Sequence, residues 1–153
     1  MKAIPIRRKP SLLAFNFAGE RLETLRAFCD SLGVDLLTHT AENDPAAFSL
    51  TLGDLLAKKA PVDLSGVSDD AKIALEAMVF PEEMFVLADF QNDTLDAFLS
   101  GIRERDLWIP LKAVATPTNQ SWVPMALRSE LMEEHAYMKQ MEEENAKKQT
   151  TDA

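Results

Sequence analysis

Two runs of apolar residues constrain the fold of this chain more than any other feature. Leu12–Phe15 and Met84–Ala88 are apolar at consecutive positions, and consecutive residues of a strand point to opposite faces of a sheet. Such strands need cover on both faces, which is typical of parallel sheets that lie between two layers of helices. The two runs therefore predict a layered α/β domain.

Helical patterns alternate with these strands. The segments Glu20–Leu32 and Asp93–Arg105 each gather their apolar residues on one helical face. Gly33 can end the first helix in the left-handed conformation that glycine tolerates. Two further strands are predicted at Val34–Thr38 and Leu111–Ala115, and a long helix from about residue 122.

This order of elements predicts a three-layer α/β fold with a short, mostly parallel four-stranded sheet and a long C-terminal helix. The alternative is an α+β, ferredoxin-like fold of two strand–helix–strand units. In that alternative, the middle segment or the C-terminal helix would have to cover the open face of the sheet.

The two halves of the chain also resemble each other. The stretches LLAFNFAGERLETL and FVLADFQNDTLDAF align with a constant offset of 73, so that Phe17 falls on Phe90 and Asn16 on Asp89. An ancestral duplication and a chance similarity of two amphipathic units are both consistent with this alignment.

The domain organisation follows from proline, charge and apolar spacing. Residues 1–10 read as a basic flexible arm, residues 11–141 as a single α/β domain, and residues 142–153 as a disordered tail that begins where the apolar face of the last helix ends. Within the domain, residues 40–82 form an irregular or helical middle segment. It is expected to hold a short helix at Leu50–Ala57, a loop at Pro61–Ser68 and a helix at Asp69–Met78.

Composition and charge exclude several classes of function. The net charge is −9, and because residues 1–10 carry +4, the rest of the chain carries −13, which repels phosphate backbones and argues against nucleic-acid binding. No apolar run approaches the ~18–20 residues of a membrane span. Cys29 is the single cysteine, so no intrachain disulfide can form, which suits the cytoplasm.

A candidate site lies where the predicted strands end. Ligands of open parallel sheets bind outside the carboxyl ends of the strands, and the long helix would direct its positive N-terminal end to the same rim. A small anion or polar metabolite fits such a rim. The predicted ligand-binding residues are Asn16, Asp89, Lys112, Thr116, Thr118 and Asn119.

Each of these residues also has a plain structural interpretation. Short polar side chains commonly cap helices and hydrogen-bond to turns, and a lysine in an outer strand often protects a sheet edge. The two interpretations do not exclude each other.

Catalytic and metal-binding patterns are weak. His39 and His135 lie far apart in sequence, and no serine or cysteine stands in a recognisable nucleophile motif. The cluster Glu133–His135 lacks the spacing that two metal ligands on one helix need. We therefore predict no catalytic residues and no metal ligands, and no particular cofactor is indicated.

Several motifs resemble one protein family. The runs MFVLADF, TLDAFLSGIR, IPLKAVATPTNQSW and LMEEHAYM are similar to a bacterial family of uncharacterised proteins, domain of unknown function 3783. The resemblance extends over Leu12–Met138. It implies no activity, substrate or cofactor, but it implies a glycine at the position of Asp89 and a shorter middle segment, so that Ser49–Met78 would contain an insertion.

Three functional hypotheses follow. The first is a soluble, cytoplasmic, non-enzymatic module that binds a small anion or polar metabolite at the strand-end loop 116–121, or regulates through it. The alternative is a protein-interaction domain that acts through the C-terminal helix, including as a homodimer. The third is an enzyme that uses Asp89 or Lys112 as acid or base, and an enzymatic role is the less favoured class.

Overall fold

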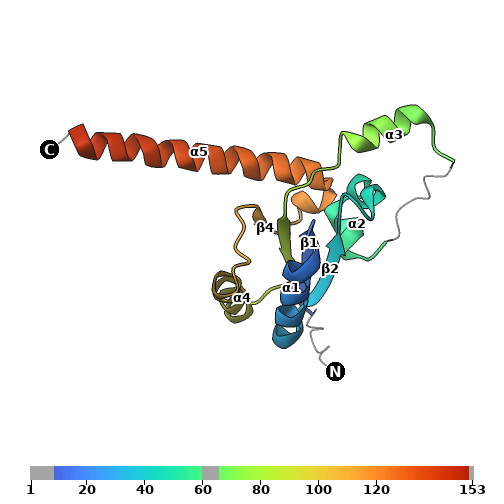
Figure 1. Cartoon of the computed structure of the whole chain (residues 1–153), viewed down its shortest axis with the longest axis horizontal. Coiled ribbons are helices and arrows are strands. Elements are labelled where there is room, and N and C mark those ends of the chain that lie inside the picture. Colours follow the sequence, from blue (N-terminus) through green and yellow to red (C-terminus); the bar gives the residue numbers. More distant parts are fainter. Residues whose placement is uncertain (1–8, 60–65, 152–153) are drawn as a thin grey trace, which may run out of the picture.

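The computed structural model describes residues 9–59 and 66–151, and a four-stranded mixed sheet lies at its centre (Figure 1). The strand order is β2 (Asp35–His39), β1 (Ser11–Phe15), β3 (Met84–Ala88), β4 (Lys112–Val114). β1 is parallel to β2 and β3 is parallel to β4, whereas the central strands β1 and β3 are antiparallel. The predicted α/β fold is confirmed.

The expectation of a mostly parallel sheet needs correction, because the central pair runs in opposite directions. A helical crossover requires parallel strands only within one strand–helix–strand unit. The two units are joined by the long segment 40–82, and a connection of that length imposes no direction on the second unit. Each unit is internally parallel, and the two meet as an antiparallel pair.

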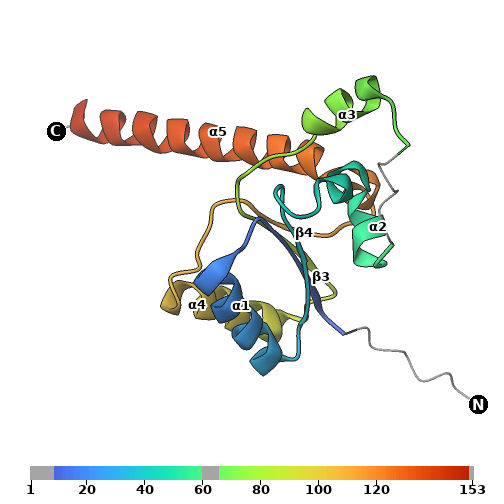
Figure 2. The same ribbon diagram turned by 45° about the vertical axis from the view of Figure 1, so that its right-hand side comes forward.

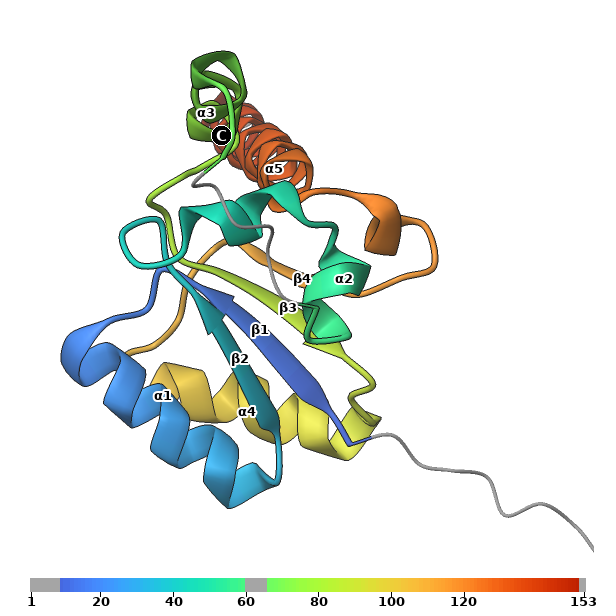
Figure 3. The same cartoon turned by 90° about the vertical axis from the view of Figure 1, so that its right-hand side faces the viewer.

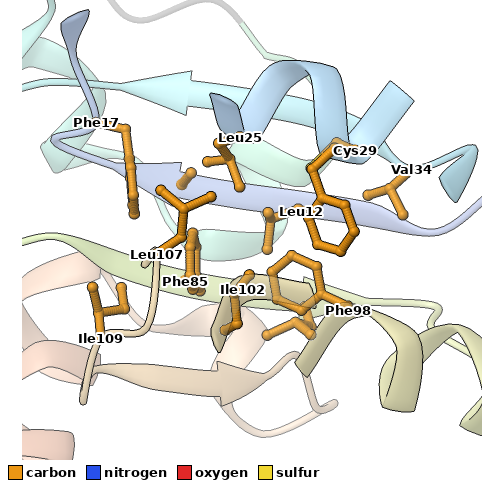
Figure 4. Packing of buried hydrophobic residues seen from close by; sticks show 13 residues of the cluster. Leu12, Phe17, Leu25, Cys29, Val34, Phe85, Phe98, Ile102, Leu107 and Ile109 are labelled. Atoms are coloured by element: carbon orange, nitrogen blue, oxygen red, sulfur yellow. The ribbon is translucent and has the colours of Figure 1, made fainter. Parts of the chain in front are cut away.

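Helices α1 (Gly19–Leu32) and α4 (Asn92–Glu104) cover one face of the sheet (Figures 2 and 3). Leu12 of β1 and Phe85 of β3 point into this layer, where Leu25 and Ile102 of the helices meet them (Figure 4). All four side chains are fully buried. Cys29 also lies in this core, and burial raises the pKa of its thiol to about 12, as expected of an inert core cysteine.

The opposite face is covered by the middle segment and the C-terminal helix. This layer contains η1 (Pro45–Ser49), α2 (Leu52–Leu56) and the start of α5 (Pro124–Thr151), while α3 (Asp69–Glu76) and η2 (Asn119–Ser121) lie at its margins. Alternate strand residues point into it, where Leu13, Phe15, Met84 and Val86 pack with Phe48, Leu52 and Leu127. The sheet is thus buried on both faces, which explains the consecutive apolar residues of β1 and β3.

The middle segment contains two short helices, α2 and α3. The N-terminus of α2 is closed by a capping box between Thr51 and Asp54. Ser68 caps α3 by accepting a hydrogen bond from the backbone N–H of Ala71. Most of the loop predicted at Pro61–Ser68, and residues 1–8 of the predicted arm, lie outside the described residues.

Helix α5 leaves the body of the protein (Figure 1). Leu127 is 3% exposed, and a bidentate ion pair between Arg128 and Glu82 holds this end of the helix. Residues 132–147 are all exposed. The helix nevertheless continues to Thr151, so the disordered tail predicted from residue 142 is replaced by helix. Its glutamates, lysines and alanines favour helix, and the anchored first turns remove the cost of nucleation.

The offset of 73 between the two halves also holds in the structure. It carries the bounds of β1 onto those of β3 and the first residue of α1 onto the first residue of α4. Phe28 and Gly101 are equivalent by this offset, and they touch where the two helices cross. A Cβ atom on Gly101 would lie 2.0 Å from Cζ of Phe28. The Phe28 ring can therefore occupy its position only because residue 101 has no side chain.

We expect Gly101→Ala to lower the free energy of unfolding. Overpacking costs about 1–3 kcal/mol, and the 2.0 Å approach to the ring places this variant at about 2–3 kcal/mol. The better helix propensity of alanine returns up to about 1 kcal/mol, so the net loss in urea denaturation should be about 1–2 kcal/mol. Combining it with Phe28→Leu should recover part of the loss. Gly66→Ala is the control, because nothing lies within 4 Å of the added Cβ there. Equal effects at Gly66 and Gly101 would contradict the proposed clash.

Candidate functional site

In the mixed sheet, the carboxyl ends of the strands lie at two opposite ends of the sheet. β1 and β2 finish at one end, whereas β3 and β4 finish at the other, because the central pair is antiparallel. Asn16, which follows β1, therefore lies away from Asp89, which follows β3, and from residues 116–121, which follow β4. The expectation that all of these residues share one rim is wrong for Asn16.

Asn16 holds the middle segment against the sheet. Its Nδ2 donates to the carbonyl oxygens of Phe80 and Glu82, both at 2.8 Å, and its Oδ1 accepts from the backbone N–H of Ala41 at 2.8 Å. The residue adopts a left-handed backbone with φ of 66°, which asparagine tolerates better than most residues. The side-chain amide of Asn16 therefore hydrogen-bonds to the backbone through both its nitrogen and its oxygen.

The loop after β4 is organised by its own side chains. Oδ1 of Asn119 accepts from the backbone N–H of Thr116 at 2.8 Å, and Oγ1 of Thr116 accepts from the backbone N–H of Asn119 at 3.1 Å. Nδ2 of Asn119 donates to the carbonyl of Val114 at 3.0 Å, and this residue is 7% exposed. Oγ of Ser121 donates to the carbonyl oxygen of Thr118 at 3.1 Å, while the Thr118 side chain is exposed. The turn-and-cap interpretation therefore describes Thr116 and Asn119.

A cleft of about 350 Å³, which we call the strand-end cleft, opens beside this loop. Asp89 enters it from the end of β3, Gln120 from η2, and Lys9 and Ser11 from the start of β1. The remaining walls are Gly53, Leu56, Ala57, Ala88 and Ala115. Asp89 is exposed and, like Asn16, has a left-handed backbone, with φ of 61°.

Helix α2 closes the cleft against the loop. The backbone N–H of Leu52 donates to the carbonyl of Trp122 at 2.9 Å. A Cβ on Gly53 would lie 3.1 Å from the carbonyl oxygen of Gln120, so the helix and the loop are in close contact. Sequence reasoning identified Asp89 and the loop but missed Lys9, Ser11 and Gln120. The basic arm was the only signal that could have pointed to Lys9.

Lys112 does not belong to the strand-end cleft. Its Nζ lies 3.5 Å from the ring centroid of Trp108 and donates to the carbonyl of Ile109. Arg103 stacks on the same ring at 4.1 Å. Burial, together with the nearby charge of Arg103, lowers the pKa of Lys112 below its usual value. The lysine sits on the α4 side of edge strand β4, in keeping with its structural interpretation.

The family comparison concerns the second unit. Residues 83–138 match the family described as Domain of unknown function (DUF3783). The resemblance is therefore confirmed over β3, α4, β4, the loop and the first half of α5. No curated protein and no solved structure matches the chain.

The DUF3783 match contains Asp89, Lys112 and the 116–121 loop but not Asn16. The description of DUF3783 names no activity, so the site rests on geometry. Among the described residues, no three His, Cys, Asp or Glu side chains gather as a metal site would require. No helix in the described part of the chain is long and apolar enough to cross a membrane.

Asn16 and Asp89 occupy equivalent backbone positions but should respond differently to glycine, which accommodates a left-handed φ. We expect Asn16→Gly to lower the free energy of unfolding by about 2–3 kcal/mol, because three hydrogen bonds are lost at about 0.5–1.5 kcal/mol each. Asp89→Gly should change it by about 0.5 kcal/mol or less. Urea denaturation measures both variants, and equal losses would disprove the structural role of Asn16.

Proposed function

We propose that this protein is a non-enzymatic binding or regulatory module that takes a small polar metabolite in the strand-end cleft. One observation supports the proposal above all. Lys9, Asp89 and Gln120 come from three separate segments to one cleft, and none of the described residues hydrogen-bonds or ion-pairs with their side chains. Such polar groups are available to a ligand.

The charges of the cleft favour a polar metabolite over a simple anion. The ammonium group of Lys9 attracts an anionic group, but the carboxylate of Asp89 repels it and instead accepts hydrogen bonds from amines or hydroxyls. The amide of Gln120 can both donate and accept. A volume of about 350 Å³ lies within the range of small-molecule sites. A ligand that carries both an acceptor and a donor group therefore suits the cleft.

We place the protein in the cytoplasm. Its single cysteine, Cys29, is buried and forms no disulfide, and a chain without a disulfide is suited to a reducing compartment.

Thermal-shift and calorimetric screening with amino acids, polyols, nucleosides and inorganic anions tests the proposal. We expect at least one polar metabolite to raise Tm. Asp89→Asn should weaken its binding about tenfold or more, since hydrogen bonds to charged groups contribute about 1.5–3 kcal/mol. Asp96→Asn, an exposed carboxylate on α4, is the matched control and should bind normally. The proposal fails if no compound raises Tm, or if Asp89→Asn and Gln120→Ala bind as the unchanged protein does.

Helix α5 supports a second candidate function, protein interaction through the C-terminal helix, with a homodimer as the simplest case. Several large apolar side chains on its projecting part are open to solvent: Met132 is 41% exposed, Tyr137 63%, Met138 60% and Met141 39%. Neighbouring apolar side chains at helical spacing are typical of helix-mediated association.

We expect the double variant Met138→Glu/Met141→Glu to reduce self-association in multi-angle light scattering at increasing protein concentration. Ala126→Glu/Glu130→Gln, which changes the exposed surface near the start of the helix, is the control. A monomer at every concentration would remove the homodimer from consideration and leave only a different protein partner.

The enzyme hypothesis gains no specific support. It requires Asp89 or Lys112 as acid or base, and Lys112 does not line the strand-end cleft that holds Asp89. Asp89 lines the strand-end cleft, whereas Lys112 stacks on Trp108.

A further inference from the structure

A second concave surface, which we call the α5 groove, lies where α5 leaves the body. It has a volume of about 520 Å³ and lies between α5 and the segment that leads into β4. Its apolar walls are formed by Ile109, Pro110 and Leu111 on the body and by Met132 and Ala136 on the helix. The groove shares no residue with the strand-end cleft.

Both carboxylates of the α5 groove are neutralised by arginines. Glu83 accepts from Nε and Nη2 of Arg21, both at 2.8 Å. Glu82 accepts from Nε of Arg128 at 3.2 Å and also from its Nη2, and this hydrogen bonding to Arg128 lowers the pKa of Glu82. Bidentate pairs of this kind fix both partners, so neither carboxylate is available to a ligand.

Lys139 is the lysine that lines the groove. None of the described residues forms an ion pair with Lys139 or His135, the two remaining polar residues of the groove. Because Arg21 and Arg128 pair with the two glutamates, Lys139 is the one charged residue lining the groove without an ion-pair partner among the described residues. The α5 groove therefore combines apolar walls with a single ammonium group at its rim.

We propose that the α5 groove binds a small molecule with an apolar body and one carboxylate. The apolar body would lie against Pro110, Met132 and Ala136, and Lys139 would donate a charge-assisted hydrogen bond to the carboxylate. One carboxylate fits better than a doubly charged phosphate, because Lys139 is the one ammonium group that the groove offers to an anion. The volume lies in the range of small-molecule pockets, which typically pair apolar walls with a few polar groups.

Calorimetric titration with linear monocarboxylates, from butanoate to decanoate and below their micelle concentrations, tests this inference. Each added methylene should tighten binding about three- to fourfold until the groove is filled. The primary alcohols of equal length should bind less tightly than the acids. Affinity that is independent of chain length, or equal for acids and alcohols, would overturn the proposal.

Variants locate the binding. Lys139→Gln should weaken carboxylate binding about tenfold and leave alcohol binding unchanged, whereas Lys72→Gln, an exposed lysine on α3, should change neither. Ala136→Trp fills the groove and should abolish both. Circular dichroism verifies that the helix persists in each variant.

Two outcomes would count against the inference. Unchanged carboxylate binding by Lys139→Gln would show that the anion sits elsewhere. A dimer in light scattering that carboxylates do not perturb, with no heat of binding, would show that a second copy of the chain occupies the groove. Neither outcome bears on the strand-end cleft, where Asp89→Asn provides the independent test.

Discussion

The antiparallel pairing of β1 with β3 determines the rest of the structure. Leu13 pairs with Val86 in this register, and the sequence offset of 73 also carries Leu13 onto Val86. A residue that pairs with its own equivalent marks the place where a twofold axis can relate the two strand–helix–strand units. The same axis brings Phe28 against its equivalent, Gly101. Two phenylalanine rings would not fit at this helix crossing. The helices pack closely because α1 supplies the ring of Phe28 and α4 supplies a glycine that leaves room for it.

The two units share more than their order of elements. The backbone N–H of Val34 donates to the carbonyl of Cys29 at 2.9 Å, and the equivalent Leu107 donates to Ile102 at 2.7 Å. The left-handed residues recur at the same offset, because Asn16 matches Asp89 and Gly33 matches Asp106. Repetition of caps, turns and strand bounds at one constant offset favours duplication over chance similarity, since amphipathic patterning alone does not specify the turn at which each helix ends.

The sequence predicted what is local and missed what is distant. Strand β3 has the predicted bounds Met84–Ala88, and helices α1 and α4 begin within one residue of prediction, because periodicity and caps are encoded in neighbouring residues. The direction of one unit relative to the other is not encoded in that way. Ser11 pairs with Ala88 only because β1 and β3 are antiparallel, and this register brings Ser11 and Lys9 beside Asp89. A parallel sheet would have brought Asn16 beside Asp89 instead. The wrongly predicted strand direction therefore explains both why Asn16 was assigned to this site and why Lys9 and Ser11 were missed.

Asn16 and Asp89 share a left-handed backbone conformation but have different roles. Both positions are left-handed, a conformation that favours glycine, asparagine and aspartate over other residues. At Asn16 the amide is needed, because it binds two carbonyls and one N–H of the middle segment, and a carboxylate could not donate to those carbonyls. At Asp89 no described residue requires the side chain, which is why a glycine, as the DUF3783 resemblance implies, would fit the backbone equally well. The choice among three residues at this position therefore sets the charge of the strand-end cleft without altering the fold around it.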